Sequence, residues 1–136
     1  VATCDISGAF LKSKIDQETF VIVDGPLVDM LIRSDASYKE FVHTTKQGKK
    51  VVYLQLLKAL YGTVKAARLF WENLTDKLKK YGFIVNKYDQ CVANMMIDGT
   101  QCTVCWHVND LKISHKMKQV VDGVIDYLES IFGKHK

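Results

Sequence analysis

Apolar and polar residues follow two different periods along this chain, and the periods predict its elements. Over residues 64–81, apolar side chains recur at the three- and four-residue spacing of one helix face. They are Ala67, Phe70, Trp71, Leu74, Leu78 and Tyr81. Gly82 follows at a typical helix C-terminus. A second amphipathic helix is predicted from Val120 to Phe132, ending at Gly133.

Shorter runs rich in β-branched and aromatic residues predict strands. They are residues 1–5, 19–23, 51–57, 91–97, 101–108 and 111–115. The dipeptide Asp98-Gly99 predicts a tight hairpin, and Gly8 and residues 24–26 predict turns. Residues 27–50 fit neither period, apart from a turn at Gln47-Gly48. Strands with helices packed on one face of the sheet amount to an α+β fold.

Composition adds that the chain is an ordinary globular protein. Its 136 residues are enough for one compact domain and few for two. No apolar run approaches the roughly 20 residues that a membrane helix needs, so we expect no membrane contact. The chain starts at Val1 directly in a predicted strand, without a secretory signal or an initiator methionine, so we expect either a fragment of a longer polyprotein or an incomplete gene model.

Charge is concentrated in the middle of the chain. Residues 41–90 carry ten Lys/Arg and three Asp/Glu, whereas residues 1–40 carry four Lys/Arg and seven Asp/Glu. A basic segment of this kind attracts a phosphate backbone and makes binding sensitive to salt. The alternative is a solvated surface with lysines on exposed helix faces.

The cysteines do not predict a zinc site. Cys102 and Cys105 have CxxC spacing, but they fall in a predicted strand, where a two-residue period places them on opposite faces. Reduced thiols in the protein interior are the better interpretation.

Candidate chemistry lies at the tip of a predicted hairpin, His107-Val108-Asn109-Asp110, and at Asp5, the last residue of the first strand. Neighbouring strands lie about 4.8 Å apart, so carboxylates on two strands can converge on the same ions. Such an arrangement suits two divalent metals roughly 3.5–4 Å apart, as in phosphoryl transfer by polymerases and nucleases.

Three ordered blocks resemble the reverse transcriptase of copia-type LTR retrotransposons. Residues 1–12 resemble the first catalytic motif, in which an aromatic residue follows an aspartate by five positions. Residues 57–71 resemble the LYG-containing segment, although Ala67 replaces a proline and residues 63–65 differ. His107-Val108-Asn109-Asp110 occupies the place of YVDD or HVDD, and Tyr88-Asp89-Gln90-Cys91 links the last two blocks.

The resemblance implies an RNA-directed DNA polymerase. It implies a polymerase palm from residues 1–12 and 63–136, an antiparallel sheet with helices on one face, and part of the fingers from residues 13–62, without thumb or upstream fingers. The implied partners are an RNA template, a DNA primer, deoxynucleoside triphosphates and the remaining polyprotein with its integrase and RNase H. Two Mg²⁺ or Mn²⁺ ions are the implied cofactors, and cytoplasmic virus-like particles the implied location.

By the same resemblance, Asp5, the backbone carbonyl of Ile6 and Asp110 are metal ligands. Asn109 stands where the family has a catalytic aspartate, and an amide brings no charge. Loss of that anion is expected to remove roughly 4 kcal/mol of transition-state stabilisation, which is about a thousandfold in rate. We therefore expect an impaired or inactive polymerase; an error in the sequence is the competing explanation.

The remaining site residues follow from the same motifs. Phe10 matches the steric gate that excludes a ribose 2′-hydroxyl, or is one more core phenylalanine. Tyr61 and Gly62 match a nucleotide-binding segment. Lys65 and Arg68 are placed to reach phosphates. His107 is expected to pack beneath the primer end.

Two further functional interpretations remain open. The first is a non-catalytic nucleic-acid-binding module, retained or domesticated after the metal site decayed. The second is a degenerate fragment that does not fold stably by itself. Asp89, near Cys91, fits the family but also fits an ordinary turn.

Overall fold

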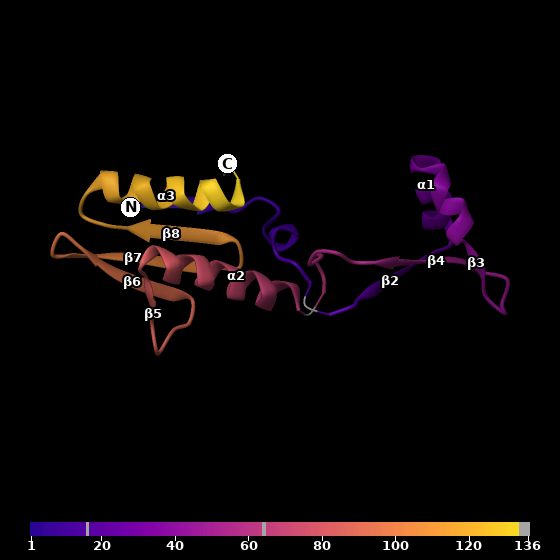
Figure 1. The fold of residues 1–136 in the computed structure, drawn as a ribbon, viewed down its shortest axis with the longest axis horizontal. Coiled ribbons are helices and arrows are strands. Elements are labelled where there is room, and N and C mark those ends of the chain that lie inside the picture. Colours follow the sequence, from indigo (N-terminus) through magenta and orange to yellow (C-terminus); the bar gives the residue numbers. More distant parts are fainter. Residues whose placement is uncertain (16, 64, 134–136) are drawn as a thin grey trace. The chain divides into compact units, whose positions relative to one another are not determined.

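The computed structural model describes residues 1–15, 17–63 and 65–133, and the chain forms two compact units (Figure 1). The first unit comprises Val1–Lys14 and Lys58–Lys136, and the second comprises Ile15–Leu57. The predicted assignment of residues 1–12 and 63–136 to a palm, and of 13–62 to fingers, stays a prediction.

A five-stranded antiparallel sheet forms the centre of the first unit, with the strand order β1-β8-β7-β6-β5. Its strands are β1 (Ala2–Asp5), β5 (Ile84–Val85), β6 (Val92–Ile97), β7 (Thr100–His107) and β8 (Asp110–Ser114). The first strand of the chain therefore lies beside the last, although more than 100 residues separate them. Asp98 and Gly99 both have positive φ, 47° and 72°, as the predicted tight turn between β6 and β7 requires.

Buried and more exposed side chains alternate along β7 and β8, which distinguishes the two faces of this sheet. Val104 and Ile113 are Cα partners and fully buried, whereas their neighbours Cys105 and Lys112 share the opposite face. The predicted separation of Cys102 and Cys105 is confirmed, because Cys102 is fully buried and Cys105 lies with Lys112. One face is thus core and the other is open, as is common in antiparallel sheets.

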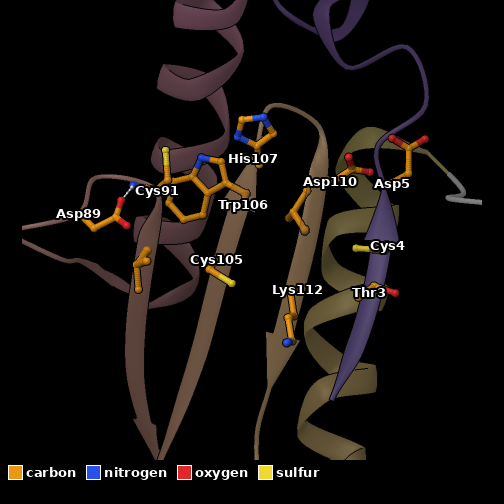
Figure 2. Close-up of a pocket in the computed structure, with 12 residues that line it drawn as sticks. Thr3, Cys4, Asp5, Asp89, Cys91, Cys105, Trp106, His107, Asp110 and Lys112 are labelled. Atoms are coloured by element: carbon orange, nitrogen blue, oxygen red, sulfur yellow. Dashed lines mark hydrogen bonds between the residues drawn. The ribbon is translucent and has the colours of Figure 1, made fainter.

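Two helices cover the buried face, α2 (Ala66–Tyr81) and α3 (Lys118–Phe132) (Figure 2). Both predicted helices are confirmed, with Gly82 and Gly133 as their C-caps. The Tyr127 hydroxyl donates to the Lys77 carbonyl at 2.9 Å and joins the two helices.

The core face of α2 differs from the prediction near the start of the helix. Ala67 is exposed, and Ala66 and Leu69 are buried in its place, with Phe70, Leu74 and Leu78. Val64, the first residue of the predicted helix, lies outside the described residues. The short helix η1 (Ala9–Lys12) follows β1, after Gly8 at a φ of 64°.

The second unit contains a three-stranded sheet with the order β2-β4-β3. Its elements are β2 (Phe20–Asp24), α1 (Pro26–Ser34), the short helix η2 (Ala36–Phe41), β3 (His43–Thr44) and β4 (Lys50–Gln55). The predicted turn at residues 24–26 is wrong beyond Gly25, because Pro26 begins α1. Proline fits a first helical position, where its missing N–H is not needed.

The fold is therefore mixed α+β with antiparallel sheets, as predicted. In the part of the chain that the structure describes, no helix has the length and apolarity needed to cross a membrane.

Candidate functional site

Asp5 and Asp110 lie directly opposite one another on the neighbouring strands β1 and β8, where they are Cα partners. The Ile6 N–H donates to the Asn109 carbonyl at 3.0 Å, so residues 6 and 109 form the adjacent hydrogen-bonded pair. Asp5 and Asp110 then form a non-hydrogen-bonded pair, the type in which opposing side chains approach more closely. Figure 2 shows their carboxyl groups beside one another at the end of the sheet.

The turn that delivers Asp110 has a strained backbone. His107 and Asp110 are Cα partners, so Val108 and Asn109 alone connect β7 to β8. Val108 has a φ of 56°, a conformation that a β-branched side chain strongly disfavours. Strain of this kind costs about 1–3 kcal/mol and concentrates at functional sites. The turn is therefore an independent sign that this end of the sheet is a site.

Asn109 contacts the strand acid directly. Its side-chain Nδ2 donates a hydrogen bond to Oδ1 of Asp5. The Ser7 hydroxyl lies 3.4 Å from the other oxygen, Oδ2, as a weak second donor. Both oxygens of Asp5 thus have a protein donor, and the amide supplies the stronger one.

The donor set has the chemistry of a divalent-cation site, and the predicted pair of ions stays a prediction. Two carboxylates and the Ile6 carbonyl are hard oxygen ligands of the kind that Mg²⁺ prefers, with water and phosphate completing its shell. The Ile6 carbonyl also accepts from Ala9 N–H at 3.1 Å, which leaves one lone pair. Within residues 1–15, 17–63 and 65–133, no three His, Cys, Asp or Glu side chains cluster as a metal site. With Asn at 109, this end of the sheet has two acids rather than three.

A shallow hollow of about 560 Å³ leads along the open face to these acids. Thr3, Cys105 and Lys112 line it together with the two aspartates, and Figure 2 shows them on adjacent strands. Sequence reasoning missed these three residues. The two-residue period of β1, β7 and β8 was the available signal, because it places them on the face that carries the acids.

Cys4 also lines this hollow, and its thiol feels the charge of Asp5. Partial burial raises the pKa of the Cys4 thiol above its usual value, and the nearby carboxylates of Asp5 and Glu129 raise it further. The thiol therefore reports on the charge at the acidic end of the sheet.

Trp106 was also missed. It is 6% exposed, it lines the hollow, and its indole Nε1 has no hydrogen-bond partner among the described residues. His107 is exposed at the end of the open face (Figure 2). Its predicted place beneath a primer end stays a prediction.

Phe10 is largely buried, with 7% of its surface exposed. Its ring lies 4.3 Å from the ring of Tyr61 and 6.2 Å from that of Phe70, measured between centroids. Tyr61 itself is 52% exposed, so it covers Phe10 from the solvent side. A gate role for Phe10 stays a prediction. A nucleotide sugar would have to pass Tyr61 to contact the Phe10 ring.

The remaining predicted residues lie around the start of α2. Gly62 has a φ of 86°, which explains glycine at this position. Lys65 is the N-cap residue of α2. The Arg68 Nε donates to Glu72 Oε1 at 2.8 Å, one helical turn along. The Asp89 side chain accepts from Cys91 N–H at 2.8 Å, so it stabilises a turn.

Comparisons of the chain with known protein families, with curated proteins and with solved structures found no match.

Proposed function

We propose that this chain is part of an RNA-directed DNA polymerase of the copia type, with a palm formed by residues 1–12 and 63–136 and part of the fingers by 13–62. One observation carries the proposal. The two motif acids, Asp5 and Asp110, are far apart in sequence yet are Cα partners on adjacent strands. Had Asp5 been distant from residues 107–110, the proposal would have failed.

Three further features support a palm. Both acids lie on the sheet face opposite the helices, so an extended duplex has access to them (Figure 2). The open face leads to the acids through a continuous hollow. The turn beside Asp110 holds a strained Val108, as expected of a segment kept for positioning rather than for stability.

The residues then have distinct tasks. Asp5, Asp110 and the Ile6 carbonyl would hold Mg²⁺ or Mn²⁺, which when bound lowers the pKa of a primer 3′-hydroxyl and offsets charge on the triphosphate. Phe10, Tyr61 and Gly62 would border the incoming deoxynucleotide. Lys65 and Arg68, at the start of α2, would contact phosphates of the template or primer.

Asn109 limits this activity in two ways. Its amide lacks the charge of the family's aspartate, and its Nδ2 occupies Oδ1 of Asp5 with a hydrogen bond. A metal ligated through that oxygen has to displace the amide. We therefore propose that polymerisation is reduced about a thousandfold, corresponding to roughly 4 kcal/mol.

A primer-extension assay with the Asn109→Asp variant tests the proposal. The variant and the unmodified chain are compared on an RNA template with a DNA primer, deoxynucleotides and Mn²⁺ or Mg²⁺. We expect extension to rise by about a thousandfold in the variant, and to be lost when Asp110→Asn is added. Equal activity in the unmodified chain and the variant would refute the role of residue 109. Extension that survives in both Asp5→Asn and Asp110→Asn would refute the catalytic site.

A second function is favoured by one specific observation, the donors that both Asp5 oxygens already have. A carboxylate satisfied in this way needs no cation, as in a nucleic-acid-binding module that no longer catalyses. Duplex binding that falls steeply with salt but is unchanged by Mn²⁺ or chelator favours this module. Binding of Mn²⁺ that is lost in Asp110→Asn favours the polymerase.

A further inference from the structure

A second hollow of the first unit is rich in lysine. It has a volume of about 530 Å³ and lies between the end of η1, the middle of α2 and the end of α3. Its lysines are Lys12, Lys14, Lys58 and Lys77, and among the residues that the structure describes no aspartate or glutamate lines it. None of its lining residues belongs to the hollow that leads to Asp5.

Lys14 and Lys58 are the unusual pair within it. They face one another across an isolated antiparallel bridge, at the points where the chain leaves the first unit and returns to it. The Ala59 N–H donates to the Ser13 carbonyl at 3.0 Å and fixes the two segments side by side. Like charges directly opposite in such a pair are destabilising. The bridge therefore places two lysines of like charge directly opposite one another.

The other two lysines have compensating partners. Lys77 lies 3.4 Å from Asp76. The Lys12 ammonium lies near Gly133, the C-cap of α3. The C-terminal end of a helix attracts cations. Among the described residues, no carboxylate is paired with Lys14 or Lys58. The hollow thus carries positive charge that the described residues do not neutralise.

Polar groups and a suitable size complete the hollow. Ser13 is only 3% exposed, and its hydroxyl lies 3.4 Å from Asn73 Nδ2, which lies 3.4 Å from the Lys12 carbonyl as well. Leu69 and Phe132 supply apolar walls. The volume falls within the ≈ 300–1,000 Å³ of small-molecule sites.

We propose that this hollow binds a small anion that carries two or more phosphoryl groups. Lysine binds phosphate as a point charge with three donors, and a multiply charged anion relieves the repulsion between Lys14 and Lys58. A concave hollow with a buried serine fits a compact ligand better than the convex backbone of a nucleic acid. The site goes beyond the proposed polymerase and does not depend on it.

Calorimetric titration of the whole chain with inorganic pyrophosphate tests this site. Chelator is present throughout, so that any metal-dependent binding at Asp5 and Asp110 does not contribute. We expect one binding site, at least tenfold weaker in Lys14→Gln and in Lys58→Gln. Lys116→Gln removes the same charge from an exposed position outside the hollow and is expected to bind as the unmodified chain does.

Three results would overturn the proposal. The first is that pyrophosphate does not bind. The second is that Lys116→Gln weakens binding as much as Lys14→Gln and Lys58→Gln do. The third is that a single-stranded RNA oligonucleotide binds through Lys14 and Lys58 when pyrophosphate does not. Lys58→Arg changes the side chain but keeps its positive charge. It is therefore expected to retain binding within about threefold. A cooperative thermal melt of each variant, followed by circular dichroism, shows that it is folded. Failure of primer extension leaves these outcomes unaffected.

Discussion

The side-chain amide of Asn109 donates a hydrogen bond to Oδ1 of Asp5, across the junction of the turn and the first strand. An ionised aspartate at position 109 has no proton to donate. It would instead place a third negative charge beside Asp5 and Asp110, which are already opposite one another. The amide therefore stabilises the acidic end of the sheet without a cation, and an aspartate would make that end depend on one.

This difference predicts that Asn109→Asp is less stable without metal and is rescued by it. Loss of the hydrogen bond and the added repulsion are expected to lower the free energy of unfolding by about 1–3 kcal/mol. Urea unfolding in chelator and in Mn²⁺ measures the effect. A metal that binds the folded but not the unfolded state should raise the free energy of unfolding by about 2.7 kcal/mol at one hundred times its dissociation constant.

Asn109→Ala is the matched control for this rescue. It removes the hydrogen bond without adding charge, so we expect destabilisation that Mn²⁺ does not reverse. Equal metal rescue of the aspartate and alanine variants would contradict the explanation.

Phe10→Ala is expected to destabilise the first unit and to change sugar selection. Phe10 has 7% of its surface exposed and its ring packs on Tyr61 and Phe70, so its removal should lower the free energy of unfolding by about 3–5 kcal/mol. In an Asn109→Asp background, the smaller side chain should also admit ribonucleotides. Extension with ribonucleoside triphosphates measures the second effect.

Leu69→Ala separates the two roles of Phe10. Leu69 is also buried, on α2, and its truncation should destabilise the unit by about 2–5 kcal/mol without changing sugar selection. If both variants discriminate equally between the two sugars, Phe10 is a core residue and not a gate.

The longer elements of the first unit could be predicted because each has a single strong period and a clear boundary, whereas the short strand β5 and the short helix η1 show no period. The stripe of α2 and its C-terminal Gly82 need no tertiary information, and Asp98-Gly99 determines a hairpin by its backbone preference alone. The segment 27–50 could not be predicted in the same way. Its helix α1 has nine residues, shorter than the window of about 11–18 residues over which a helical period is recognised.

The candidate site also has a part that the sequence predicts and a part that it does not. The convergence of Asp5 with Asp110 was predictable from motif order, but the partner of Asn109 was not. Its hydrogen bond depends on the strand register and on the φ of Val108, and no local pattern encodes either. The exposure of His107 also follows from register, since the alternation of β7 places it on the open face beside the acids.

Val108→Gly is expected to stabilise the turn. Glycine adopts a φ of 56° without strain, whereas valine adopts it at a cost of about 1–3 kcal/mol. Because glycine also loses more entropy on folding, the net gain in the free energy of unfolding should be about 1 kcal/mol. Urea unfolding measures it.

Ile84→Gly provides the comparison for that change. Ile84 is a β-branched residue with 75% exposure in strand β5, where its φ is negative. Glycine there should destabilise by about 1 kcal/mol, because it relieves no strain. Equal destabilisation by both substitutions would show that the backbone of Val108 carries no strain.

Alkylation of Cys4 is expected to report the charge of Asp5. Burial raises the pKa of the Cys4 thiol first, and the carboxylates of Asp5 and Glu129 raise it further. Because the thiolate is the reactive form, the rate with iodoacetamide should reach half its maximum at a higher pH than for an ordinary thiol. Removing the negative charge in Asp5→Asn favours the thiolate, so that midpoint should move to lower pH.

Mass spectrometry of peptides containing Cys4, taken across a pH series, measures this midpoint. Mn²⁺ bound at Asp5 should lower it in the unmodified chain, since a nearby cation favours the thiolate as the loss of a carboxylate does. In Asp5→Asn the metal should have much less effect. A midpoint that neither Asp5→Asn nor Mn²⁺ moves would mean that burial alone sets the pKa of Cys4, and that no cation binds beside it.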